Sequence, residues 1–221
     1  MAKKPQKPNE SCRKSSGDGM AIQSINYDAL HGEGTKLIDQ WLSRALDKEN
    51  GGEGRAFERF IYAWIAFNGL ASCLTGKEKD SEILAAIAGC PSLQLAFDRQ
   101  KADSLAFSRQ VAALCGEFPI FRVSDIRGKE LKMSHDRQER SEMRNLYRQE
   151  GVECEPRCWF THADGCPQDW AHVLFGIYRV RNNLFHGEKS VTSDQDAFIV
   201  DAAYQVLVNF QALWALGPRR A

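Results

Sequence analysis

Residues 168–186 read QDWAHVLFGIYRVRNNLFH, and this stretch decides how the rest of the chain is interpreted. Placed on a helix at about 100° per residue, its large apolar side chains gather on one side. They are Trp170, Val173, Leu174, Ile177, Leu184 and Phe185. The spacing therefore predicts a helix over residues 168–186 that packs this stripe against a core, and Gly187 is the expected helix stop.

Helical spacing of apolar residues recurs along most of the chain. A last helix is expected over 194–216, where Ser193 and Asp196 form a capping signature at its start. No pair of strands with alternating apolar residues is evident, so the predicted fold class is all-α. The other expected helices cover 37–46, 55–75, 83–88, 93–114 and 138–149, and the segments 116–136 and 151–167 are expected to be mainly irregular.

Length and composition indicate an ordinary globular protein. The 221 residues can bury a real core, and 43% are hydrophobic and 26% charged. Residues 1–20 are rich in Lys, Pro, Ser and Gly without an apolar pattern, so we expect a disordered basic tail there. Residues 21–221 are expected to form a single helical domain.

Charge and cysteine content limit the classes of function. The chain has 29 basic and 29 acidic residues, so bulk charge cannot hold nucleic acid, and any RNA contact must come from a local basic cleft. The seven cysteines are an odd number in a chain too large to need disulfides, and we expect free thiols. The polar start and the lack of a long apolar run favour a cytoplasmic protein that does not enter a membrane.

Arg181 is the anomaly of the predicted helix, because it falls in the middle of the apolar stripe. A buried guanidinium without a partner is costly, so Arg181 must meet an acid, a polar groove or a ligand phosphate. Asn182 and His186 are four residues apart and share a face beside the stripe. Arg179, seven residues before His186, projects to nearly the same side, and the helix dipole favours a protonated His186 in the last turn.

These residues support two interpretations. Two cations, an amide and an imidazole at one edge suit a site that grips a phosphodiester and moves protons. The structural interpretation is that Arg181 pairs with an acid on another helix and that His186 only ends its helix.

The stretch 177–189, IYRVRNNLFHGEK, resembles the signature of the HEPN superfamily, in which Arg-x-x-x-x-His carries Asn directly after the Arg. The wider string looks most like the Apea-like branch. Residues 60–68, FIYAWIAFN, are similar to the aromatic helix that precedes the motif helix in such proteins. The order of aromatic helix, long insertion, motif helix and final helix agrees from about residue 35 to 216.

This resemblance implies a HEPN-like helical bundle, with additional helices and loops inserted between the aromatic helix and the motif helix. It implies a homodimer in which two motifs face one cleft. Many members are metal-independent endoribonucleases in toxin–antitoxin, phage-defence or RNA-processing systems, so RNA would be the substrate and an antitoxin or other protein inhibitor a partner. Other members have lost catalysis and serve as interaction or nucleotide-binding modules. No cofactor is implied.

By the same resemblance, Arg181 would bind the scissile phosphate, and Asn182 would orient either the phosphate or its partner side chains. His186 would act as general base or acid while the ribose 2′-OH attacks and leaves a cyclic phosphate. One branch of the family carries Tyr as a modification target two residues after the motif histidine. Glu188 stands at that position here, which argues against regulation by that route.

Two further sets of polar residues are candidates. Asn68 lies in the apolar stripe of the helix over 55–75. Its amide is expected either to hydrogen-bond Arg181 or His186 across the bundle, or to be satisfied by the backbone. A second set of residues, evenly spaced by four, offers three thiols and an imidazole to a structural zinc ion. It lacks the usual Cys-x-x-Cys pair, and the alternative is that the cysteines are inert free thiols. This set, which would make the protein a zinc-stapled scaffold, is Cys154, Cys158, His162 and Cys166. His172 stands alone in the sequence.

Overall fold

The computed structural model describes residues 32–47, 55–133, 137–161, 166–187, 189 and 193–216. The expected tail over 1–20 and His162 lie outside these residues. The described chain is predominantly helical, which confirms the all-α prediction. In chain order the elements are α1 (Gly32–Leu46), α2 (Arg55–Thr75), α3 (Asp80–Ala88), α4 (Pro91–Asp103), α5 (Leu105–Cys115), β1 (Ile120–Phe121), α6 (Val123–Gly128), α7 (Arg137–Gln149), β2 (Cys154–Glu155), the 3-10 turn η3 (Trp159–Thr161), α8 (Trp170–Phe185) and α9 (Asp194–Leu216).

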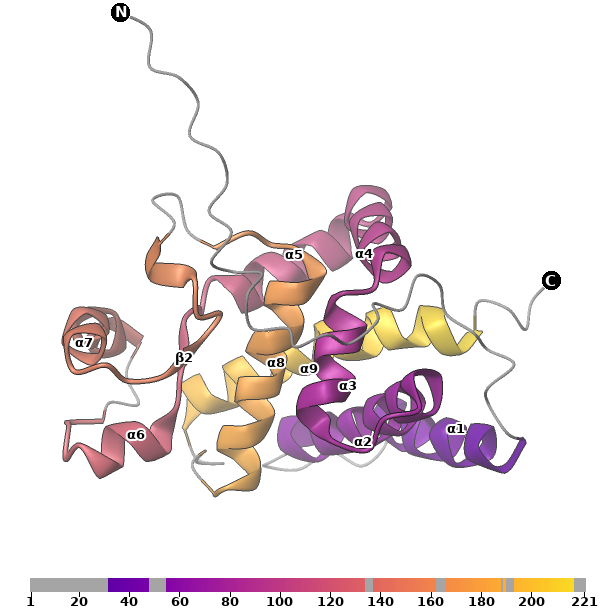
Figure 1. Cartoon of the computed structure of the whole chain (residues 1–221), viewed down its shortest axis with the longest axis horizontal. Coiled ribbons are helices and arrows are strands. Elements are labelled where there is room, and N and C mark those ends of the chain that lie inside the picture. Colours follow the sequence, from indigo (N-terminus) through magenta and orange to yellow (C-terminus); the bar gives the residue numbers. More distant parts are fainter. Residues whose placement is uncertain are drawn as a thin grey trace, which may run out of the picture.

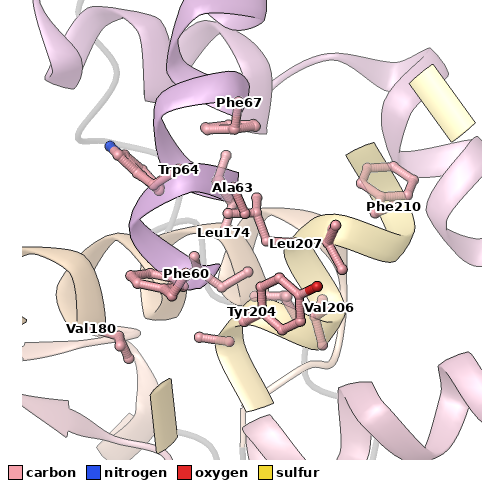
Figure 2. Close-up of a cluster of buried hydrophobic side chains, with 14 of the residues drawn as sticks. Phe60, Ala63, Trp64, Phe67, Leu174, Val180, Tyr204, Val206, Leu207 and Phe210 are labelled. Carbon is pink, nitrogen blue, oxygen red and sulfur yellow. The ribbon is translucent and has the colours of Figure 1, made fainter. Parts of the chain in front are cut away.

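The helices α2, α8 and α9 share one apolar core, as their spacing predicts. Figure 2 shows aromatic side chains of α2 beside aliphatic side chains of α8 and a row of residues from α9. Complete burial of each such side chain stabilises the fold by about 1.5–3 kcal/mol. The labelled members are Phe60, Ala63, Trp64, Phe67, Leu174, Val180, Tyr204, Val206, Leu207 and Phe210. Among the described helices, none is both long and apolar enough to cross a membrane.

The motif helix α8 runs through the middle of the molecule (Figure 1). On one side it contacts α3, and on the other it contacts the short sheet formed by β1 and β2. Gly176 lets the segment just before β1 lie close to α8, because a Cβ atom there would collide with the ring of Phe118. Beyond the sheet, Ile126, Tyr147 and Val152 form a separate small apolar cluster. The insertion between α2 and α8 therefore packs against α8 itself.

The prediction of one helix over residues 93–114 was wrong. The helix breaks at Ser104, whose hydroxyl accepts a hydrogen bond of 3.2 Å from the backbone N–H of Phe107 and so caps a new helix. Serine is common at such caps, but it also occurs inside helices, so the break has no unique signature in the sequence.

The segment 116–136 is also more ordered than predicted. It contains α6 and the strand β1, which pairs antiparallel with β2 through Ile120 with Glu155 and Phe121 with Cys154. Each strand has two residues, which is too short for an alternating pattern to appear in the sequence. Only the tertiary contact between the two segments makes them strands.

Candidate functional site

The motif residues occupy the last turn of α8. Asp169 caps the start of this helix by accepting a 3.0 Å hydrogen bond from the backbone N–H of His172. At the other end His186 is the C-cap residue, and its backbone N–H donates to the carbonyl of Asn182 over 3.1 Å. Gly187 then turns the chain away with a φ of +66°, a conformation that favours glycine. The predicted ends of the helix and the position of His186 are confirmed.

Arg181 is held from several directions and keeps part of its surface in solvent. Its guanidinium lies 3.4 Å from a carboxylate oxygen of Asp80 on α3 and donates a 2.9 Å hydrogen bond to the side-chain oxygen of Asn182. Its central carbon lies 4.6 Å from the ring centre of Phe185 and 5.7 Å from that of Trp64. The side chain is 24% exposed. Asp80 is therefore the acid that the position of Arg181 in the stripe requires.

The Nε–H of Arg181 has no acceptor among the residues that the structure describes. This nitrogen is buried. Such a group costs free energy unless something accepts from it. The other side of the guanidinium is committed to Asp80 and Asn182, so Arg181 combines a fixed orientation with an unsatisfied donor.

Asn182 and His186 complete this end of the helix. Asn182 is half-buried and uses its side-chain oxygen to hold Arg181. The His186 side chain is exposed, and within the described part of the chain its imidazole makes no hydrogen bond. The structure thus brings Arg181 and Asn182 into contact and leaves the imidazole in solvent at the C-cap of the same helix.

Phe185 differs from the prediction. Its place in the apolar stripe predicted burial, but 48% of its surface is exposed, and its ring covers the guanidinium of Arg181. In the same turn Asn183 is buried and Leu184 packs against the core, so only one side of the turn faces solvent. The surface around His186 therefore combines an exposed ring with a cation.

Arg179 lies on a different side of α8 from Arg181. It is buried, and its guanidinium lies 3.4 Å from Glu153 and 4.0 Å from Glu155. Partial burial alone would raise the pKa of Glu153, but the surrounding arginines, Arg122 foremost, hold that pKa below its usual value. The expected supporting role of Arg179 toward His186 has no contact behind it in the structure, and its contacts are those of an ion pair that attaches α8 to β2.

Asn183 is a buried polar residue of α8 that its sequence pattern did not single out. It is 1% exposed, its amide donates a 2.8 Å hydrogen bond to the backbone carbonyl of Phe121, and its side-chain oxygen accepts from the N–H of Val123 at 3.5 Å. It lies one turn after Arg179 on the same face. Two polar residues four apart were the sign in the sequence that this face of α8 contacts polar groups of another segment.

Asn68 lies half-buried on α2, one turn after Trp64. No hydrogen bond joins it to Arg181 or His186 among the residues that the structure describes. Trp64, not Asn68, is the residue of α2 that contacts Arg181.

The predicted cysteine set is only partly assembled. The Sγ atoms of Cys158 and Cys166 are 3.3 Å apart, but Cys154 on β2 does not belong to this group. Burial raises the pKa of the Cys154 thiol to about 11. The third member of the group is His172, whose Nε2 lies 3.1 Å from the Sγ of Cys158. His172 seemed isolated in the sequence because it follows Cys158 by 14 residues, and only the fold brings the two side chains together.

A pocket of about 400 Å³ lies elsewhere, between the end of α1 and the start of α2. Two of its three arginines serve the structure: Arg55 donates to the carbonyl of Asp47, and Arg59 donates to the carbonyl of Ala45 and to the hydroxyl of Tyr204. These bonds satisfy carbonyls at the end of α1 that no helical N–H reaches. The pocket therefore gives no better candidate than the motif.

Comparison with protein-family models, with curated proteins and with solved structures gave no match to this chain. The geometry of the motif therefore remains the guide to function.

Proposed function

We propose that the protein is a metal-independent endoribonuclease whose catalytic residues are Arg181, Asn182 and His186. The observation that carries the proposal is the last turn of α8. Arg181 and Asn182 are joined by a 2.9 Å hydrogen bond, and the imidazole of His186 is exposed at the C-cap of the same helix. A fixed cation and an exposed imidazole at the same helix end would provide phosphate binding and proton transfer.

In the proposed reaction, His186 removes the proton of a ribose 2′-OH. The 2′ oxygen attacks the adjacent phosphorus, the bond to the 5′ oxygen breaks, and an imidazolium returns a proton to that oxygen. The products are a 2′,3′-cyclic phosphate and a 5′-hydroxyl. Arg181 stabilises the charge that develops on the phosphate oxygens, and Asn182 keeps the guanidinium in place.

A homodimer would supply the second imidazole and a larger positive field. The chain has no net charge, so a single motif attracts RNA weakly. Two motifs facing each other would double the local positive charge and provide one base and one acid. In such a dimer the exposed ring of Phe185, which lies against Arg181, would stand at the edge of the contact between subunits.

The contact with Asp80 favours a second function, a binding module without catalysis. A carboxylate 3.4 Å from Arg181 already neutralises the guanidinium. In that case the motif would be structural, and the exposed surface around Phe185 and His186 would bind a partner protein or a nucleotide.

The test is cleavage of a short single-stranded RNA by the purified full chain in buffer that contains EDTA, with circular dichroism in the same buffer to check that chelation leaves the helices intact. We expect wild-type cleavage to end in a cyclic phosphate, and a 2′-deoxy sugar at the cut site to block it. His186→Ala should lose cleavage by about 100-fold or more, the usual contribution of a general acid or base, without loss of helicity. The exposed Arg109 on α5 provides the control for removal of a charge, and Arg109→Ala should cleave normally. Equal activity of His186→Ala, or cleavage of the 2′-deoxy substrate, would favour the binding module.

A further inference from the structure

A group of thiols and an imidazole lies at the opposite end of α8 from the motif. The Sγ atoms of Cys158 and Cys166 and a ring nitrogen of His172 all lie within 4.8 Å of one another. The shortest separations are 3.3 Å between the two sulfurs and 3.1 Å between the Sγ of Cys158 and the Nε2 of His172. We propose that Cys158, Cys166 and His172 bind a structural zinc ion.

The donor chemistry and the spacing both suit zinc. Thiolate and imidazole are the ligands that zinc takes in structural sites. With Zn–S near 2.3 Å and Zn–N near 2.0 Å, tetrahedral geometry separates the ligand atoms by about 3.5–3.8 Å. The two short separations therefore have to widen by only a few tenths of an ångström to hold the ion, and the third is within 4.8 Å. The described residues supply three of the four ligands of a tetrahedral site.

Asp169 is a positioning residue for this site. Its carboxylate lies 2.6 Å from the Nδ1 of His172 and accepts a 3.0 Å hydrogen bond from the backbone N–H of the same residue. Because Nδ1 is held by the carboxylate, Nε2 is directed at the sulfur of Cys158. A carboxylate behind the imidazole is the usual support of a zinc-bound histidine, since it fixes the ring and raises its basicity.

The place of the site in the fold indicates its role. Cys158 lies between β2 and η3, Cys166 precedes α8, and His172 lies in the first turn of α8. A bound ion would therefore tie the insertion to the start of the motif helix. His172 precedes His186 by 14 residues, which corresponds to about 21 Å along a helix. The proposed zinc is thus remote from the proposed catalytic residues and stabilises the fold.

The primary experiment measures zinc in the full chain, purified with a reductant and without chelators, by mass spectrometry of the metal. We expect about one zinc per chain, because folding and binding at such sites are coupled. Cys158→Ser, Cys166→Ser and His172→Ala should each reduce the zinc content to near zero. Cys73→Ser is the matched control, because this free thiol lies on α2 outside the group, and it should keep its zinc.

Two further variants separate this site from the set that the sequence spacing suggests. Cys154→Ser should keep its zinc, because Cys154 lies outside the group. Asp169→Ser retains a good helix cap but is too short to reach Nδ1, so we expect zinc affinity, measured by competition with a chromophoric chelator, to fall by about 10–100-fold. Loss of zinc from Cys154→Ser together with full zinc in His172→Ala would overturn the assignment.

Variants that lose their fold would also lose zinc, so a second measurement uses the wild-type chain. Zinc is removed by dialysis under reducing conditions, helicity is checked by circular dichroism, and cobalt(II) is added. We expect thiolate-to-cobalt absorption and the visible bands of tetrahedral cobalt, both abolished by stoichiometric zinc. A fully reduced, helical chain that takes up neither metal overturns the proposal, and so does a chain isolated with a Cys158–Cys166 disulfide and no zinc.

Discussion

At the scale of single residues, Arg181 decides between the two proposed functions. Its guanidinium contacts a carboxylate, an amide and two aromatic rings, yet its side chain is 24% exposed and its Nε is unsatisfied within the described residues. If the guanidinium binds phosphate, Asp80 competes with the substrate. If it is only structural, Asp80 is its intended partner.

We expect Asp80→Asn to tighten RNA binding several-fold, because the neutral amide no longer offsets the charge of Arg181. Both side chains of this pair are partly exposed, so its loss should lower the free energy of unfolding by no more than about 1 kcal/mol. Fluorescence anisotropy with a labelled, uncleavable 2′-deoxy oligonucleotide measures the affinity, and urea unfolding measures the stability. Weaker or unchanged RNA binding in Asp80→Asn would assign Arg181 to the structural pair.

At the scale of elements, the connection from α8 to α9 depends on a buried ion pair. The ammonium of Lys189 lies 2.8 Å from a carboxylate oxygen of Asp196, and the two side chains are 4% and 2% exposed. Asp196 also donates its backbone N–H to the hydroxyl of Ser193 over 3.3 Å, which confirms the predicted cap of α9. These contacts hold Lys189 against the first turn of α9.

Lys189→Ala should lower the free energy of unfolding by about 3–5 kcal/mol, because it leaves a carboxylate buried without its cation. Lys79→Ala is the matched control: Lys79 lies 3.5 Å from Glu82, but both side chains are largely exposed, and the change should cost less than about 1 kcal/mol. Urea unfolding followed by circular dichroism compares the two variants. Similar losses in both would show that the buried pair has no special weight.

At the scale of the whole molecule, the exposed end of α8 is where a second subunit would contact the protein. The proposed site needs two imidazoles, and a neutral chain gains a strong local positive field only by bringing two motifs together. Phe185 lies inside the motif, directly before His186, and has 48% of its surface exposed.

We therefore expect light scattering at micromolar concentration to give about twice the 24.9 kDa of one chain, as for a closed two-fold dimer. Phe185→Glu should produce a monomer that no longer cleaves RNA, because it places a charge in the contact and near the phosphate site. Leu105 on α5, 66% exposed, provides the control, and Leu105→Glu should remain a dimer. A wild-type monomer would contradict the dimeric site.

Much of the fold was predictable because helices are local. The spacing of apolar residues placed α8 and α9 within about two residues of their ends, and the capping pair Ser193 and Asp196 marked the start of α9. The break at Ser104 was not predicted, because serine is a common residue both at caps and inside helices. The two strands were not predicted, because they form only by pairing across more than thirty residues. Local periodicity contains no information about such long-range pairs.

By itself, the sequence determined that the protein is helical, that residues of α2, α8 and α9 share a core, and that Arg181, Asn182 and His186 stand at the end of one helix. Only the tertiary structure decided the environment of each polar group. In the folded chain Arg181 pairs with Asp80, and Arg179 pairs with Glu153 and Glu155. His172 lies beside Cys158 and Cys166. The physical reason is that a helix sets the side on which a residue lies, whereas its partners come from whichever segment packs against that side.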